Sequence, residues 1–245
     1  MMWKDRWSAI VKKIEVIDTA GGESALLARL TPATVPRVLA FVNAHAMNSC
    51  ATDLAFFEAL ASADILLRDG SGMAILFRHT QRDPGLNMNG TDLIPKILAT
   101  FRGRSVALWG TRDPFLEQAV LRSEREFAVR VTSCADGFCD VNHYLRLARE
   151  TLPDLIVLGM GMPKQEQLAK ALRTQAAGPA LIVCGGAILD FLGGKVVRAP
   201  KFMRRIGLEW LYRFALEPRR LFRRYVMGNP AFLLKLAAWK RDGAP

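Results

Sequence analysis

The stretch Asp154–Gln167, DLIVLGMGMPKQEQ, joins a short apolar run, two glycines and the start of a helix. Leu155–Leu158 is too short and too apolar for a solvated helix, which predicts a buried strand of a parallel sheet. Gly159 and Gly161 allow backbone conformations that a Cβ would block. Pro163 suits the first position of a helix, where its missing N–H costs nothing. The stretch therefore predicts a strand, a tight loop and a helix.

A helix N-terminus after such a loop suits a phosphate or a diphosphate. It offers unpaired N–H groups and partial positive charge, to which Lys164 could add a charge and Gln165 a directional hydrogen bond. The dinucleotide-binding fingerprint is incomplete, because Lys164 stands where a third glycine is expected, and no Walker Gly-Lys-Ser/Thr is present. A purely structural strand-to-helix turn is the alternative interpretation.

Other strands are expected on both sides of this stretch, at Ile14–Asp18, Val38–Val42, Asp64–Leu67, Ser105–Trp109, Ala128–Thr132 and Ala180–Cys184. Helical patterns of roughly 10 to 15 residues alternate with them. This order predicts an α/β fold, a Rossmann-like parallel sheet with flanking helices and right-handed crossovers. Ligands are then expected at the carboxyl ends of the strands, where Asn43, Asp69, Gly110, Gly159 and Gly185 fall.

Cap and breaker residues predict where several helices begin or end. Ser24 and Thr52 are each expected at the start of a helix, and Thr91 or Asp92 is expected to cap another. The run Gly228-Asn229-Pro230 is expected to break the last helical segment.

Positive charge is concentrated at the C-terminus. The 245 residues carry a net charge of +11, of which +9 lies in residues 198–245. After Gly193–Pro200 strands cease, and arginines and aromatic residues dominate. We therefore expect an α/β domain over residues 1–197 and a basic, aromatic-rich helical appendage over residues 198–245.

The appendage pattern suits an anionic membrane surface. Met203, Ile206, Trp210 and Phe214 recur at helical spacing among arginines, as in cationic helices that lie on membranes. Nucleic acid or a subunit contact, including a homo-oligomer, are the alternatives. No apolar run approaches the roughly 18 to 20 residues of a bilayer span, and no signal peptide is evident, so a cytoplasmic location is expected.

Metal and cofactor signatures are absent from the sequence. The four cysteines, Cys50, Cys134, Cys139 and Cys184, lack the spacing of a metal site and are expected to be buried free thiols. No two aspartates are separated by one residue. No metal and no cofactor is therefore expected, and charge on a diphosphate would be met by helix N-termini and arginines.

Asp69 is the candidate general base. It follows a predicted strand and lies beside glycines, where a carboxylate could reach a substrate hydroxyl. A turn or helix-cap aspartate is the structural alternative. Asn43 and His45 are expected at the same edge of the sheet, where they could orient a polar substrate.

Eight motifs, taken in order, resemble the WecG/TagA/CpsF glycosyltransferases, glycosyltransferase family 26. They are FVNAHAMN (41–48), ADILLRDGSG (63–72), MNGTDL (88–93), ALWGTRD (107–113), DGF (136–138), DLIVLGMGMPKQE (154–166), GGAILDFLGGKVVRAP (185–200) and GLEWLYRFALEPRRLFRRY (207–225). Each motif is modest, but their order is highly specific.

The resemblance implies an inverting, metal-independent transferase of cell-surface or exopolysaccharide biosynthesis. Such an enzyme moves a sugar from a UDP-sugar donor to a polyprenyl-diphosphate-linked sugar acceptor at the inner face of the membrane. The implied donor is of the N-acetylmannosamine, N-acetylmannosaminuronic acid or glucose type. The implied partners are these two substrates and an anionic membrane surface, with no nucleic acid.

The resemblance also implies roles for individual residues. Asp69 corresponds to the proposed base, and the appendage arginines correspond to Arg213, Arg220 and Arg223. Further substrate-binding residues are expected at Asn43, Asn89, Gly110, Gly159, Gly161, Lys164, Gln165 and Gly186. Phe41 stands where many members have threonine, so a role of that threonine does not transfer and a different donor sugar is compatible.

Two other functions compete with this interpretation. A basic nucleic-acid-binding α/β protein would use the appendage as its electrostatic footprint. A nicotinamide-dependent dehydrogenase is disfavoured by the incomplete glycine fingerprint.

Overall fold

A seven-stranded, all-parallel sheet forms the centre of the protein, in the order β1-β3-β2-β7-β6-β4-β5. The computed structural model describes residues 1–31, 35–175, 178–200, 202–203 and 207–240. The strands are β1 Ile14–Glu15, β2 Arg37–Val42, β3 Ile65–Arg68, β4 Ser105–Gly110, β5 Arg130–Ala135, β6 Leu155–Gly159 and β7 Leu181–Cys184. The predicted parallel α/β arrangement is confirmed.

The central strands are buried on both faces, which explains their uninterrupted apolar sequences. In β6, Ile156 and Leu158 point into one hydrophobic core, and Leu155 and Val157 point into the other. This alternation follows from the two-residue repeat of a strand.

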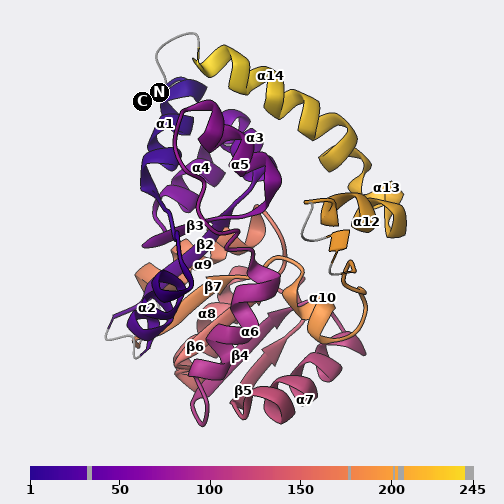
Figure 1. Ribbon diagram of the computed structural model, residues 1–245. Coiled ribbons are helices and arrows are strands. Elements are labelled where there is room, and N and C mark those ends of the chain that lie inside the picture. Colours follow the sequence, from indigo (N-terminus) through magenta and orange to yellow (C-terminus); the bar gives the residue numbers. More distant parts are fainter. Residues whose placement is uncertain (32–34, 176–177, 201, 204–206, 241–245) are drawn as a thin grey trace.

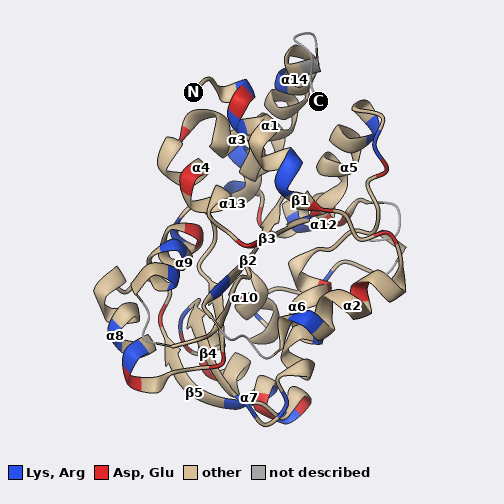
Figure 2. Cartoon of the chain, turned by 90° about the vertical axis from the view of Figure 1, so that its left-hand side faces the viewer, with Lys and Arg blue, Asp and Glu red and all other residues tan. Residues whose placement is uncertain are grey.

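Helices cover both faces of the sheet (Figure 1). One face carries α1 Trp3–Lys13, α3 Ala44–Thr52, α4 Leu54–Ala61, α5 Gly70–His79, α8 Val141–Thr151 and α9 Lys164–Gln175. The other carries α2 Ala20–Leu30, α6 Gly90–Thr100, α7 Phe115–Phe127 and α10 Ile188–Leu192. Lys and Arg are interleaved with Asp and Glu over these helices (Figure 2), in keeping with the small net charge of residues 1–197.

The C-terminal segment is helical. Its elements are α12 Glu209–Leu216, α13 Pro218–Phe222, the π-helix η1 Arg223–Met227 and α14 Gly228–Lys240. Figure 1 shows α14 passing back over α1 and α3. The ring of Trp7 in α1 lies 5.4 Å from that of Phe232 and 5.9 Å from that of Trp239. The last helix therefore shares a core with the first, while the division at residue 198 remains a prediction.

Several predicted helix ends are wrong, because other side chains cap the helices. Thr19, not Ser24, caps α2 by accepting a hydrogen bond from Gly22 N at 3.1 Å. Asn89, not Thr91 or Asp92, caps α6. Both side chains stand one residue before their helix, where N-cap oxygens reach the free N–H groups of the first turn.

The helix after β2 was not predicted, because its sequence consists mainly of small and polar residues. Ala44–Thr52 is helical, and Thr52 ends this helix instead of starting the next, which Asp53 caps. The run AHAMNSCAT lacks a clear apolar stripe, so its periodicity did not indicate a helix. The expected break at residues 228–230 is also wrong, since α14 begins there and Pro230 lies in its first turn, where proline is tolerated.

The contact between α14 and α1 predicts unequal effects of two substitutions in the same helix. Trp239→Ala should lower the free energy of unfolding by about 3 kcal/mol or more, because Trp239 is fully buried against Trp7. Leu234→Ala is the control, since Leu234 is 73% exposed. Urea unfolding measures both. If Trp239→Ala were as stable as both Leu234→Ala and the wild type, the contact between α14 and α1 would contribute little to the fold.

Candidate functional site

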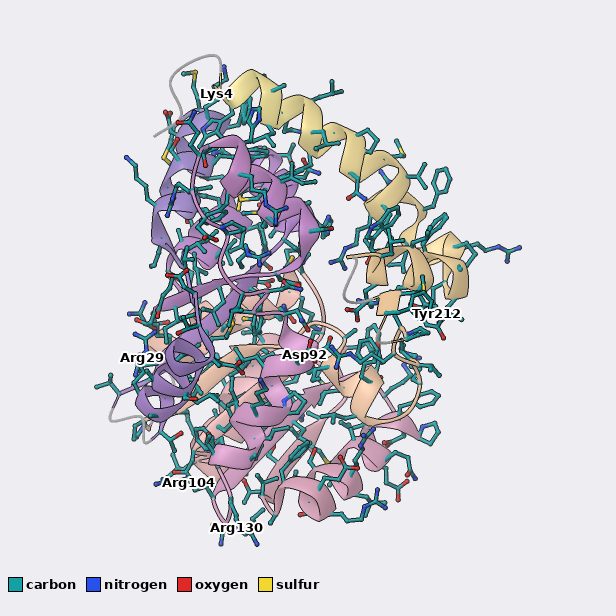
Figure 3. All side chains as sticks on the ribbon, in the orientation of Figure 1. Lys4, Arg29, Asp92, Arg104, Arg130 and Tyr212 are labelled. Atoms are coloured by element: carbon teal, nitrogen blue, oxygen red, sulfur yellow. The ribbon has the colours of Figure 1, made fainter. Side chains whose placement is uncertain are left out.

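A large cavity lies at the carboxyl ends of the strands. Its volume is about 2010 Å³, and its walls come from the loops after β2 to β7 and from the C-terminal segment. In Figure 3, Arg104, just before β4, and Arg130, at the start of β5, lie at the bottom of the view, whereas Tyr212 of α12 lies at the right-hand side, well above them. Ten of the predicted site residues line the cavity: Asn43, Asp69, Asn89, Gly159, Gly161, Lys164, Gln165, Gly186, Arg213 and Arg223.

Asp69 lies directly after β3, beside the end of β2. Its backbone N–H donates to Val42 O at 2.9 Å, and the Asn43 amide donates to its Oδ2 at 3.3 Å. Burial raises the pKa of Asp69, whereas the Asn43 hydrogen bond and the charges of Arg224, Arg213 and Arg68 lower it. The site thus contains an enclosed carboxyl group whose ionised form is supported by an amide and by nearby arginines.

A buried arginine holds the loop around Asp69. Arg68 donates to Pro84 O at 2.7 Å, Gly85 O at 3.0 Å and Gly70 O at 3.0 Å. Asn87 Oδ1 accepts from Gly70 N at 2.8 Å. These bonds fix residues 84–87 against the turn that carries Asp69. Sequence reasoning did not single out Arg68, although a charged residue within an apolar strand was the available signal.

Glycine is required where β4 and β6 end side by side. Gly110 has φ 152°, and a Cβ on it would lie 2.4 Å from the Gly159 backbone. Gly110 itself does not line the cavity; it permits the close approach of the two loops that do. Its predicted role as a direct substrate contact remains a prediction.

Gln165 connects two glycine turns. Its Oε1 accepts from Gly161 N at 3.2 Å and from Gly186 N at 2.9 Å. Gly161 has φ 79° and Gly186 φ 61°, conformations that glycine adopts readily. The helix α9 begins at Lys164, so Pro163 lies just before the helix, and the prediction that it is the first helical residue is wrong.

Lys164 contacts the loop after β5. Its ammonium group donates to Gly137 O and Cys139 O, each at 2.9 Å. Asn89, the cap of α6, also donates to Asp92 Oδ2 at 2.7 Å. Both side chains line the cavity while they hold its walls in place.

Arginines of the C-terminal segment line the cavity that also contains Asp69. The Arg213 guanidinium lies 5.4 Å from the centroid of the Phe191 ring. Arg223 is exposed and Arg224 partly buried, and both line the cavity. The side chain of the predicted Arg220 lies outside what the structure describes.

Sequence reasoning missed Arg224, whose charge lowers the pKa of Asp69 and that of His45. Residues 223–227 form a π-helix, which has a wider turn than the 3.6-residue repeat. The side-chain positions after Phe222 are therefore shifted from those of an α-helix.

His45 lines the cavity as a neutral side chain at pH 7. Burial, and then the positive charge of Arg224, lower its pKa to about 4. Phe41 also lines the cavity, close to Gly90, where a Cβ would lie 3.3 Å from its ring.

No metal centre is formed by the residues that the structure describes: no group of three or more His, Cys, Asp or Glu side chains could hold an ion. The four cysteines are free thiols. Cys50 and Cys184 are buried as expected, but Cys139 is only partly buried and Cys134 is exposed, because it lies on β5 at the edge of the sheet.

A parallel sheet with a large cavity at its carboxyl edge is typical of an α/β enzyme that binds a small ligand. The family described as "Glycosyl transferase WecG/TagA/CpsF family" matches residues 12–244. The chain belongs to this family and is a glycosyltransferase.

Several relatives, among them the following two, carry the name N-acetylglucosaminyldiphosphoundecaprenol N-acetyl-beta-D-mannosaminyltransferase. The one from Bacillus subtilis (strain 168) is 27% identical over 188 residues, which cover 75% of this chain and 73% of the relative. The one from Staphylococcus aureus (strain NCTC 8325 / PS 47) is 27% identical over 203 residues, which cover 81% and 79%. Both similarities extend over most of each chain.

The raised pKa of Asp69 predicts that this residue destabilises the folded protein at neutral pH. The protonated carboxyl group is the form that the folded protein favours. The stability that it contributes is complete below the pKa of Asp69 in the unfolded chain and is lost as the pH rises through its pKa in the folded state. Asp69→Asn should therefore be more stable than the wild type at pH 8, with a gain that shrinks toward pH 4. Urea unfolding across this range tests it, and a variant less stable than the wild type at pH 8 would contradict it.

Proposed function

We propose that this protein is an inverting, metal-independent glycosyltransferase that moves a sugar from a UDP-sugar to a polyprenyl-diphosphate-linked sugar. The observation that carries the proposal is Asp69, enclosed at the carboxyl edge of the sheet and faced by arginines from the C-terminal segment. An enclosed carboxylate suits a base, and arginines suit a diphosphate.

In the proposed reaction Asp69 takes the proton of the acceptor hydroxyl as its oxygen attacks the anomeric carbon of the donor sugar. The new carbon–oxygen bond forms as the bond from that carbon to the UDP oxygen breaks, so the configuration inverts. The Asn43 amide, 3.3 Å from Asp69 Oδ2, orients the carboxylate. Burial raises the pKa of Asp69 and so increases the basicity of its ionised form.

The leaving UDP carries negative charge that the protein must stabilise. We assign this task to Arg213, Arg223 and Arg224, and to Arg220 by resemblance, because a guanidinium binds phosphate oxygens in a bidentate manner. The turns at Gly161 and Gly186, joined through Gln165, let the backbone approach the donor. No metal ion is needed in this scheme.

The C-terminal segment is proposed to lie on the inner face of the membrane as a basic, aromatic-rich appendage of a Rossmann-like domain. Several of its apolar side chains are exposed: Phe202, Leu211, Leu216, Phe222, Val226, Met227, Leu233 and Leu234. Within the described residues, no helix is long and apolar enough to cross a membrane. Exposed apolar and basic side chains together favour peripheral binding to anionic lipid.

The donor sugar is proposed to be of the N-acetylmannosamine type, since that sugar appears in the names of both relatives. N-acetylmannosaminuronic acid and glucose are the alternative donor sugars. Phe41 lines the cavity at the position where, by the resemblance, many family members have threonine. An apolar ring at this position cannot make the hydrogen bond of a threonine hydroxyl, so a different contact with the donor sugar is proposed.

Replacing the proposed base tests the function. Asp69→Asn should lower kcat by about 100-fold or more, since a general base contributes that much, while UDP binding stays within a few-fold of the wild type. Transfer from UDP-N-acetylmannosamine to a short-chain lipid-diphosphate N-acetylglucosamine measures kcat. Activity within a few-fold of the wild type would show that Asp69 is only a turn residue.

Metal independence is a separate prediction. Transfer should persist in excess chelator, because arginines and backbone N–H groups meet the diphosphate charge. Loss of activity that magnesium or manganese restores would contradict it.

The arginines should also set the pH dependence of turnover. Arg224→Ala removes a charge that lowers the pKa of Asp69, so the acidic limb of kcat/KM against pH should move to higher pH. Arg219→Ala is the control, because Arg219 is exposed and does not line the cavity. If the acidic limbs of kcat/KM against pH coincided in the two variants, Arg224 would have no effect on the ionisation of Asp69.

A further inference from the structure

Glu166 is a buried carboxyl group that the proposed reaction does not use. It lies in the first turn of α9 and is 2% exposed. Its Oε1 accepts from Gln165 Nε2 at 2.8 Å, and its Oε2 has no hydrogen-bond partner. A buried carboxylate without a counter-ion lowers stability, so the fold alone gives no reason for it.

The charged side chains further along α9 are engaged elsewhere. Lys170 pairs with Glu58 at 3.4 Å and Arg173 with Asp64 at 2.7 Å. Among the described residues, the titratable groups of other elements on which the charge of Glu166 acts are the thiols of Cys50 on α3 and Cys184 on β7. Burial raises the pKa of Cys50 to about 12 and holds that of Cys184 well above its ordinary value, so neither thiol supplies a charge near pH 7.

The partner of Glu166 is the side chain that joins the two glycine turns. An amide has a carbonyl end and an NH₂ end, and its neighbours decide which end faces which side. The Gln165 carbonyl must face Gly161 N and Gly186 N to hold both turns. A carboxylate only accepts hydrogen bonds, so an ionised Glu166 can pair only with the NH₂ end.

We propose that Glu166 is a positioning residue: it fixes the Gln165 amide so that the Gln165 carbonyl holds the Gly161 and Gly186 turns in the shape that binds the nucleoside diphosphate of the donor. This inference rests on the proposed function, because it takes these turns as the donor site. Glu166 touches no substrate and acts only through Gln165.

The protonation state of Glu166 controls this arrangement. A protonated carboxyl group both donates and accepts, so it can pair with either end of the amide and no longer selects one orientation. Burial raises the pKa of Glu166 to about 7, with the Gln165 hydrogen bond opposing the rise. The turns are therefore held most firmly above pH 7.

Glu166→Gln tests the inference, because glutamine keeps the size of the side chain but can pair with either end of Gln165. The probe is UDP, and calorimetry gives its Kd for the wild type and the variant at pH 6 and pH 8. The ratio of the two Kd values cancels the titration of UDP and of all shared groups. We expect a ratio of about fivefold at pH 8, the loss of one oriented hydrogen bond, falling toward one at pH 6.

Two controls separate positioning from a general structural role. Gln167→Ala changes an exposed neighbour in the same turn and should leave the Kd unchanged. Glu166→Gln should have no effect on the Kd in a Gln165→Ala background, because the amide to be oriented is gone. The single variant should also unfold at a higher temperature than the wild type at pH 8, since it removes a buried charge.

The outcomes are distinct. A wild type that does not bind UDP overturns the proposed donor and this inference with it. A wild type that binds UDP, with a Kd ratio near one at pH 8 or an equal ratio at both pH values, overturns the inference alone. A Glu166→Gln variant that fails to fold also overturns it, because the carboxylate would then serve the fold.

Discussion

All seven strands run in the same direction, so their carboxyl ends gather at one edge of the sheet, and the loops there must fit beside one another. One such close fit lies between β4 and β6, where Gly110 and Gly159 are paired and a Cβ on Gly110 would meet the Gly159 backbone. A side chain on Gly110 would separate these strands. The common direction of the strands places the glycine turns, Asp69 and Asn43 around one cavity instead of dispersing them.

Two buried carboxyl groups, Asp69 in the cavity and Glu166 behind its wall, reduce the stability of the fold. Burial raises the pKa of Asp69 and of Glu166, so each carboxyl group is harder to ionise there than in water. Arg68, with three hydrogen bonds to loop carbonyls, holds the turn that carries Asp69. Such unfavourable but well-supported groups are typical of functional sites, where stability and activity oppose each other.

The body of the protein and its C-terminal segment depend on each other. Trp239 and Phe232 of α14 pack on Trp7 of α1. This packing also positions Arg224, eight residues before Phe232, where its charge acts on Asp69. A segment that binds the membrane and also completes the site would couple access to the lipid substrate with catalysis.

Sequence periodicity predicted the parts of the fold that are uniformly apolar. The strand at Leu155–Gly159 and the helix after it follow directly from the apolar run and the two glycines. Asn43 and Asp69 could be placed together because they follow paired strands, in which Val42 lies opposite Arg68. Periodicity could not indicate the family. The order of eight motifs did so, and the family match over residues 12–244 confirms it.

The rest depends on contacts between distant residues. The π-helix changes the phase of residues 223–227 and brings Arg224 toward the cavity, which no 3.6-residue pattern indicates. In the sequence, Glu166 is an ordinary charged residue in the first turn of a helix. The structure shows that it is buried and hydrogen-bonded to Gln165. The helix at Ala44–Thr52 forms because Asn43 caps it and because it packs under α14.

The central claim is that Asp69 is the base of a sugar transfer. The most direct measurement is kcat/KM against pH for the wild type and for the residual activity of Asp69→Asn. The wild type should lose activity in acid through an ionisation above the usual range of aspartate, because burial raises the pKa of Asp69. That limb should be absent from the variant. The same acidic limb in both proteins would assign the base to another group and contradict the account.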